Sequence, residues 1–148
     1  MKQIKKTNDY TAVLFTVCSM LAVLVAVWTF TGKWPWLYQP YNSYILQAQS
    51  WLSGRLDLGQ NYSHLEIAVF NGKYYISFPP FPSFVMLPFV AMGFDTCDGF
   101  IALVSALLGG VYAFRILRQC GFEKNTSVFF SLFLTVASNW LFTAQTAW

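Results

Sequence analysis

The sequence predicts an all-α polytopic membrane protein with about four hydrophobic segments and an outer loop that contains an amphipathic helix and a short β-hairpin. Three observations predict this class. Of the 148 residues, 56% are hydrophobic and only 10% are charged, whereas a soluble domain has roughly 25% charged residues. Aromatic residues reach 20%, which is typical of chains whose rings gather at bilayer interfaces. Apolar runs long enough to cross a hydrocarbon core are also present.

Basic residues gather at the ends of the apolar runs, and the formal net charge is only +3. Six of them flank the first and third runs: Lys2, Lys5, Lys6, Arg115, Arg118 and Lys124. This distribution is typical of charges that orient a membrane protein and not of a nucleic-acid interface. We therefore expect a multi-pass protein of the cell membrane, in contact with lipid, with a cytoplasmic N-terminus.

The first apolar run follows a basic leader. We expect residues 1–10 to form this cytoplasmic leader and residues 11–31 to form the first transmembrane helix, since about twenty residues span roughly 30 Å. The run is too long for a signal peptide and no cleavage site follows it. Trp28, Trp34 and Trp36 are typical of an interfacial belt instead.

Residues 32–79 form the expected outer loop, and its first half predicts a helix. Between Tyr41 and Gly54 apolar residues recur at helical spacing, while polar residues such as Gln47 take the other side. Gly54 is suited to end the helix. We expect this amphipathic helix to lie in the plane of the membrane interface.

The second half of the outer loop predicts a β-hairpin. Asn71-Gly72 favours a type I′ turn, because both central residues of that turn need positive φ. The flanking residues 67–70 and 73–76 are β-branched and aromatic, as in short strands.

Three further apolar segments follow. Residues 80–94 are either a short second transmembrane segment or a re-entrant one, because their length is marginal for a span. Residues 99–118 and 126–147 are expected to be the third and fourth segments. The third carries a stripe of small residues at Ala102, Ala106 and Gly110. Such stripes favour close packing against transmembrane helices of the same or another chain.

The orientation of the third segment depends on the second. If residues 80–94 span the membrane, the cations that follow the third segment lie outside, against the positive-inside rule. If residues 80–94 are re-entrant, the cations lie inside, as the rule prefers. We treat residues 1–148 as a single membrane domain. Because the apolar pattern continues to Trp148, we expect it to be the N-terminal part of a larger protein.

Glu66 and His64 are the candidate catalytic residues. A carboxylate in a partly dry pocket can act as a general base, and a neighbouring imidazole can orient it or accept its proton. The alternative for Glu66 is an exposed acid in a loop. On an extended strand the two side chains would share a face, so a divalent metal site is conceivable, but no further ligand has suitable spacing. We expect no metal or other cofactor.

Lys73 and Arg55 are the candidate phosphate-binding residues. Lysine acts on phosphate as a point charge, and arginine can offer a bidentate fork. The alternative for both is a contact with lipid headgroups or a role in membrane orientation.

Four motifs appear in order along the outer loop. They are Trp51-Leu52-Ser53-Gly54-Arg55-Leu56-Asp57-Leu58, Glu66-Ile67-Ala68, Gly72-Lys73-Tyr74-Tyr75 and Phe78-Pro79-Pro80-Phe81-Pro82. With the preceding helix, this order resembles the N-terminal part of GT-C fold membrane glycosyltransferases, the group that includes protein O-mannosyltransferases and aminoarabinose transferases. The resemblance covers nearly the whole chain but only the early part of such a protein.

The resemblance implies transfer of a sugar from a polyprenyl-phosphate donor to an acceptor at the outer face, with Glu66 as general base beside His64. It implies substrate and donor contacts at Lys73, Arg55, Tyr74, Tyr75, Asn42 and Asp57. The chain departs from the family pattern twice: Asn42 stands near the place of an early loop acid, and Phe78 replaces a lysine before Pro-Pro.

A second hypothesis is a small, non-catalytic protein of four helices, such as a flippase-like or assembly subunit. The DNA downstream of Trp148 distinguishes the two, because an open frame that encodes more apolar spans favours the enzyme.

Overall fold

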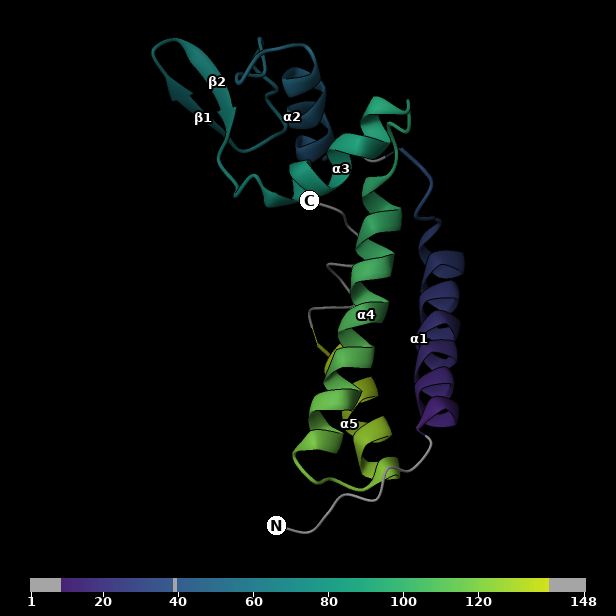
Figure 1. Cartoon of the computed structure of the whole chain (residues 1–148). Coiled ribbons are helices and arrows are strands. Elements are labelled where there is room, and N and C mark those ends of the chain that lie inside the picture. Colours follow the sequence, from purple (N-terminus) through teal and green to yellow (C-terminus); the bar gives the residue numbers. More distant parts are fainter. Residues whose placement is uncertain (1–8, 39, 139–148) are drawn as a thin grey trace. The chain divides into compact units, whose positions relative to one another are not determined.

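The computed structural model describes residues 9–38 and 40–138, which form two compact units. Unit 1 comprises the described residues up to Trp34 and from Leu103 onward, and unit 2 comprises those within Pro35–Ala102. The described elements are helices and one β-hairpin (Figure 1). In chain order they are α1 (Tyr10–Thr31), α2 (Ser43–Leu52), β1 (Ile67–Phe70), β2 (Lys73–Ile76), α3 (Phe81–Ala91), α4 (Asp98–Gln119) and α5 (Lys124–Val136).

Two helices are long and apolar enough to cross a membrane, namely α1 and α4, with 22 residues each. At a rise of 1.5 Å per residue each extends roughly 33 Å, which matches the hydrocarbon core. Helix α3 is apolar but has only 11 residues. The described part of the fourth predicted segment is the 13-residue α5, and residues 139–147 of that segment lie outside the described residues. The part of the chain described here therefore shows two of the four expected spans.

Side-chain contacts at one end of unit 1 set the direction of its helices. Arg118 near the end of α4 donates a hydrogen bond to Asp9, which precedes α1, over 3.1 Å. Lys124 at the start of α5 donates one to Thr11 at the start of α1 over 3.2 Å. Helices α1 and α4 are therefore antiparallel, and α5 runs in the direction of α1 (Figure 1).

Buried residues in unit 1 recur every fourth position, and many of them are small or polar. Helix α5 buries Ser127, Ser131 and Thr135, while Phe129 and Phe133 are about 60% exposed. The buried hydroxyls bond to carbonyls of their own helix, as Thr135 does with Ser131 over 2.8 Å. A helix in a water-soluble bundle would show the reverse pattern, with the large apolar residues inside.

In the small-residue stripe of α4, Gly110 is approached by side chains from two other helices of unit 1. Ala106 and Gly110 are buried, whereas Ala102 is half-buried in unit 2. A Cβ added to Gly110 would lie 3.0 Å from Met20 Cε on α1 and 3.5 Å from Thr135 Cγ2 on α5. The absence of a side chain at Gly110 therefore leaves room for the Met20 and Thr135 side chains against α4.

Unit 2 has its own core between α2 and α3. Residues from these helices and the segment that follows form it, at Ile45, Ala48, Met86, Val90 and Cys97. Gln47, which the sequence placed on the polar face of α2, is buried and accepts a hydrogen bond from Ser83 Oγ on α3 over 2.7 Å. That expectation is wrong because α3 packs against α2 at Gln47 and supplies a hydroxyl to pair with its amide.

The C-terminus of α2 is shaped by Gly54, as the sequence predicts. Gly54 has φ +73° and its N–H bonds to the Trp51 carbonyl, while the Arg55 N–H bonds to the Ser50 carbonyl. This pair of hydrogen bonds is a Schellman motif, which a residue with positive φ permits. It turns the chain toward the loop that carries Arg55 and Asp57.

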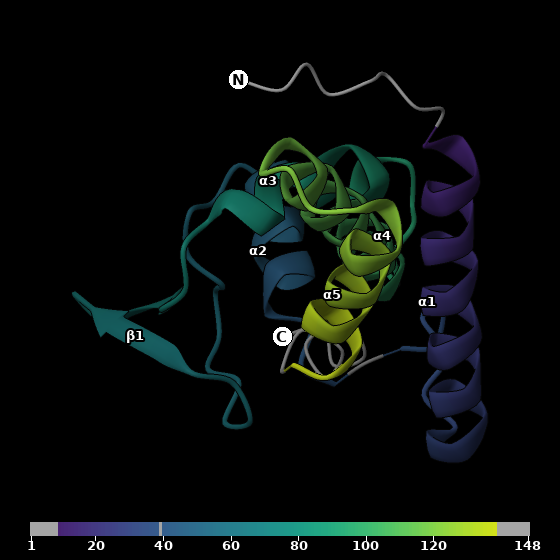
Figure 2. The same ribbon diagram turned by 90° about the horizontal axis from the view of Figure 1, so that it is seen from below.

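The β-hairpin has the predicted strands and turn. Ile67 pairs with Ile76, and Phe70 pairs with Lys73. Asn71 and Gly72 have φ values of 49° and 72°, as a type I′ turn requires. The hairpin extends away from α2 and α3 within unit 2 (Figure 2).

Candidate functional site

His64 lies in a turn and is held from two sides. The Leu65 N–H bonds to the Tyr62 carbonyl, which forms the turn. The His64 Nε2 lies 2.9 Å from the Pro40 carbonyl oxygen and therefore donates to it. The rings of Tyr41 and Tyr62 meet the imidazole edge-on, each with centroids 6.1 Å apart. In the neutral ring this leaves Nδ1 as the proton acceptor.

Glu66 follows this turn and directly precedes β1. Its backbone carbonyl accepts a hydrogen bond from Ser77 Oγ over 3.0 Å, and the residue itself is exposed. Within residues 9–38 and 40–138, no hydrogen bond or ion pair of the Glu66 carboxylate is found. The expectation that His64 and Glu66 share a face of an extended strand is wrong, because the chain turns at residues 62–65.

Lys73 pairs with Asp57. The Lys73 Nζ lies 3.6 Å from Asp57 Oδ1, with side chains 60% and 17% exposed. A backbone hydrogen bond from Leu58 N–H to the Tyr74 carbonyl, over 2.8 Å, keeps the loop beside β2. Because the lysine of this ion pair is open to solvent and the two groups are 3.6 Å apart, the pair contributes little stability. A phosphate could therefore share the ammonium group with Asp57.

Arg55 is exposed, and its guanidinium covers the backbone of Gly59. A Cβ at Gly59 would lie 3.2 Å from Arg55 Cζ. No salt bridge of Arg55 is found among the described side chains. A bidentate anion could bind to this fork without displacing a carboxylate.

The other expected substrate residues occupy separate positions. Tyr74 and Tyr75 are half-buried neighbours on β2, opposite Val69 and Ala68, so they project to opposite faces of the hairpin. Asn42 is buried before α2, where its carbonyl accepts the Leu46 N–H over 3.1 Å. Asn42 therefore has a structural position at the start of the helix.

Asp98 is a buried carboxylate that the sequence pattern did not identify as a candidate. It is 4% exposed, and neither oxygen meets a described donor at normal hydrogen-bond geometry, although the amides of its own residue and of Gly99 lie close. The neighbouring Cys97 belongs to the unit 2 core. Burial raises the pKa of the Cys97 thiol, and the charge of Asp98 adds to this effect. An acid directly before a long apolar run is the signal that could have identified it.

The candidate residues on unit 2 are therefore an exposed carboxylate, an oriented imidazole and two cations. Lys73 lies at the turn end of the hairpin, opposite Phe70, whereas Glu66 precedes its first residue, Ile67. The structure brings Lys73 to Asp57 and His64 to two tyrosines, but it forms no hydrogen bond between His64 and Glu66. No group of three or more His, Cys, Asp or Glu side chains within the described ranges is arranged to hold a metal ion. Proton transfer and anion binding are the chemistry that these groups can supply.

The described residues define a mostly helical protein with two helices long and apolar enough to cross a membrane and a small two-stranded hairpin. No protein-family model, curated protein or solved structure matches the chain.

Proposed function

We propose that the chain is the N-terminal part of an integral membrane glycosyltransferase. It would move a sugar from a polyprenyl-phosphate donor to an acceptor at the outer face of the cell membrane, with unit 2 contributing to the site. One observation carries the proposal: the candidate residues all belong to one continuous segment, Pro35–Ala102, which connects two antiparallel helices that can each span the bilayer.

The burial pattern of unit 1 supports a membrane environment. Its helices bury hydroxyl-bearing residues together with a few large apolar ones, and they also expose many large apolar residues such as Phe15 and Phe129. Exposed apolar surface is stable in lipid, whereas helix contacts there depend on small residues and on hydroxyls that satisfy their own backbone.

The short α3 supports the topology in which residues 80–94 do not span. Its 11 residues extend roughly 16 Å, about half of a hydrocarbon core, and its Ser83 is paired with α2 inside unit 2. Arg118 and Lys124 then lie on the same side of the membrane as Asp9. The positive-inside rule makes that side the cytoplasm and leaves unit 2 outside.

In the proposed reaction Glu66 accepts the proton of an acceptor hydroxyl. The hydroxyl oxygen forms a bond to the anomeric carbon of the sugar, and the bond from that carbon to the phosphate oxygen breaks. The polyprenyl phosphate leaves with the electron pair. Lys73 and Arg55 stabilise its negative charge, which is the role that cations serve at departing phosphates.

The Glu66→Gln variant of the full-length protein tests this function. It keeps the size of the side chain but removes its basicity, so we expect loss of sugar transfer by at least about a hundredfold with normal membrane insertion. Glu123→Gln, before α5, is the matched control and should retain activity. Undiminished transfer by Glu66→Gln would exclude Glu66 as the base.

A further inference from the structure

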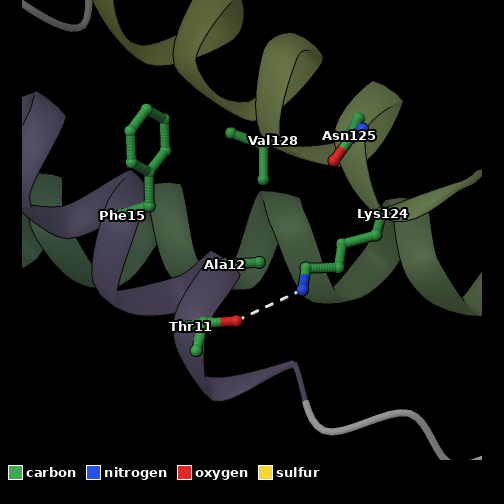
Figure 3. Close-up of a pocket in the computed structure, with 6 residues that line it drawn as sticks. All are labelled: Thr11, Ala12, Phe15, Lys124, Asn125 and Val128. Carbon is green, nitrogen blue, oxygen red and sulfur yellow. Dashed lines mark hydrogen bonds between the residues drawn. The ribbon is translucent and has the colours of Figure 1, made fainter.

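A cavity of about 320 Å³ lies between α1 and α5, at the end of unit 1 where Asp9 and Arg118 pair. This volume is at the lower end of the range for small-molecule sites, roughly 300–1,000 Å³. The lining residues are Thr11, Ala12, Phe15, Lys124, Asn125 and Val128 (Figure 3).

Polar and apolar lining residues are separated along the helices. Thr11, Lys124 and Asn125 come from the first turns of α1 and α5, and Phe15 and Val128 come one turn further into each helix. Figure 3 shows Lys124 reaching toward Thr11, with Phe15 and Val128 on the other side of the cavity. One helical turn is about 5.4 Å, so the side chains that line the cavity change from polar to apolar over that distance.

The charge at the polar end favours an anion. Lys124 is half-buried and its ammonium bonds to the Thr11 hydroxyl, which leaves two of its three donors for a ligand. Asp9 is engaged with Arg118, and the exposed Glu123 is the remaining nearby acid in the described sequence. Three lysines, at positions 2, 5 and 6, precede this end in the sequence.

We propose that this cavity binds the phosphate of an anionic membrane lipid on the cytoplasmic side. Lys124, Asn125 and Thr11 hold the phosphate, and the first part of an acyl chain or the glycerol backbone lies against Phe15 and Val128. The order of the lining matches the order of a lipid at the interface, where the headgroup is outermost. This proposal uses the membrane placement of unit 1 but is independent of any glycosyl transfer.

The test is a binding titration on the full chain in a non-ionic detergent, with short-chain phosphatidylglycerol as the probe and the unfolding temperature as the readout. Lys124→Gln should weaken binding roughly tenfold, since it removes a charge-assisted hydrogen bond. Asn125→Asp, at an exposed position that tolerates the change, should weaken it at least as much by repulsion. Lys33→Gln, after the opposite end of α1, is the control and should bind as wild type.

A second arm distinguishes a lipid from free phosphate. Val128→Trp fills the apolar part of the cavity, so it should abolish the effect of the lipid, while inorganic phosphate should have little effect on any variant. Equal stabilisation by inorganic phosphate would overturn the lipid assignment. Wild-type lipid binding by both Lys124→Gln and Asn125→Asp would overturn the site, whether or not Val128→Trp folds.

Discussion

Arg118 Nε donates a hydrogen bond to Asp9 Oδ2 over 3.1 Å and joins the end of α4 to the residue before α1. Another nitrogen of the same guanidinium donates to the Phe122 carbonyl over 2.8 Å. The two side chains are 17% and 30% exposed, so solvent screens this ion pair only in part. Within unit 1, the contact joins the end of one helix that can span a membrane to the start of the other, as expected for an antiparallel pair.

Asp9→Asn should destabilise unit 1 by about 1–3 kcal/mol, because it leaves a half-buried guanidinium without its counter-charge. We expect the exchanged pair, Asp9→Arg with Arg118→Asp, to recover part of that loss. Thermal unfolding in detergent measures both effects. Equal stability of Asp9→Asn and wild type would show that the pair contributes nothing to the helix arrangement.

Gly110→Leu should destabilise unit 1, because side chains from α1 and α5 occupy the space beside Gly110. The new side chain would overlap Met20 and Thr135, which a Cβ alone already approaches closely. Overpacking of this kind costs about 1–3 kcal/mol. Met20→Ala in the same chain should restore part of the lost stability, because it removes the flexible side chain that the new leucine would overlap. An absence of rescue in an unfolding experiment would contradict the contact between the Met20 side chain and Gly110.

Ser83→Ala should destabilise unit 2, because it leaves the buried amide oxygen of Gln47 unpaired. The expected cost is about 1–3 kcal/mol. Replacement of both partners, as in Ser83→Ala with Gln47→Leu, should cost less than the single change. Hydrogen exchange of the amides in α2 reports on this unit separately from α1. Ser53→Ala near the exposed end of α2 is the matched control.

The Cys97 thiol should react slowly with maleimide, and its reaction should need a higher pH than that of an exposed thiol. Burial and Asp98 raise its pKa, so less thiolate is present at neutral pH. The comparison uses two single-cysteine chains, one that keeps Cys97 and one that keeps the exposed Cys120. Similar rates for the two thiols near pH 7 would contradict the burial of Cys97.

Local sequence signals predict the hairpin well. Asn71-Gly72 defines its turn and leaves one pairing for the flanking residues, so the strands have the predicted bounds. The end of α2 at Gly54 is equally local, since a positive φ there determines the cap. Such features depend on a few adjacent residues and on backbone sterics alone.

Tertiary contacts are less visible in the sequence. The helical pattern predicts Gln47 at the surface, but Ser83 on α3 contacts it. Asp98 is one of a few polar residues between apolar segments, and nothing local shows that its neighbour Cys97 belongs to the unit 2 core. The turn at residues 62–65 replaces the extended strand expected through His64 and Glu66. In this turn His64 contacts Pro40 and Tyr41. These residues lie more than twenty positions away, so periodicity does not detect them.

The side of the membrane on which unit 2 lies decides whether the proposed reaction can occur at the outer face. A chain without its native cysteines receives one at Val69, which is 65% exposed on β1, and a second chain keeps only Cys120. In intact cells an impermeant maleimide should label the Val69→Cys chain at once and the Cys120 chain only after permeabilisation. Labelling of the Val69→Cys chain only after permeabilisation would place unit 2 in the cytoplasm and contradict the proposed reaction at the outer face.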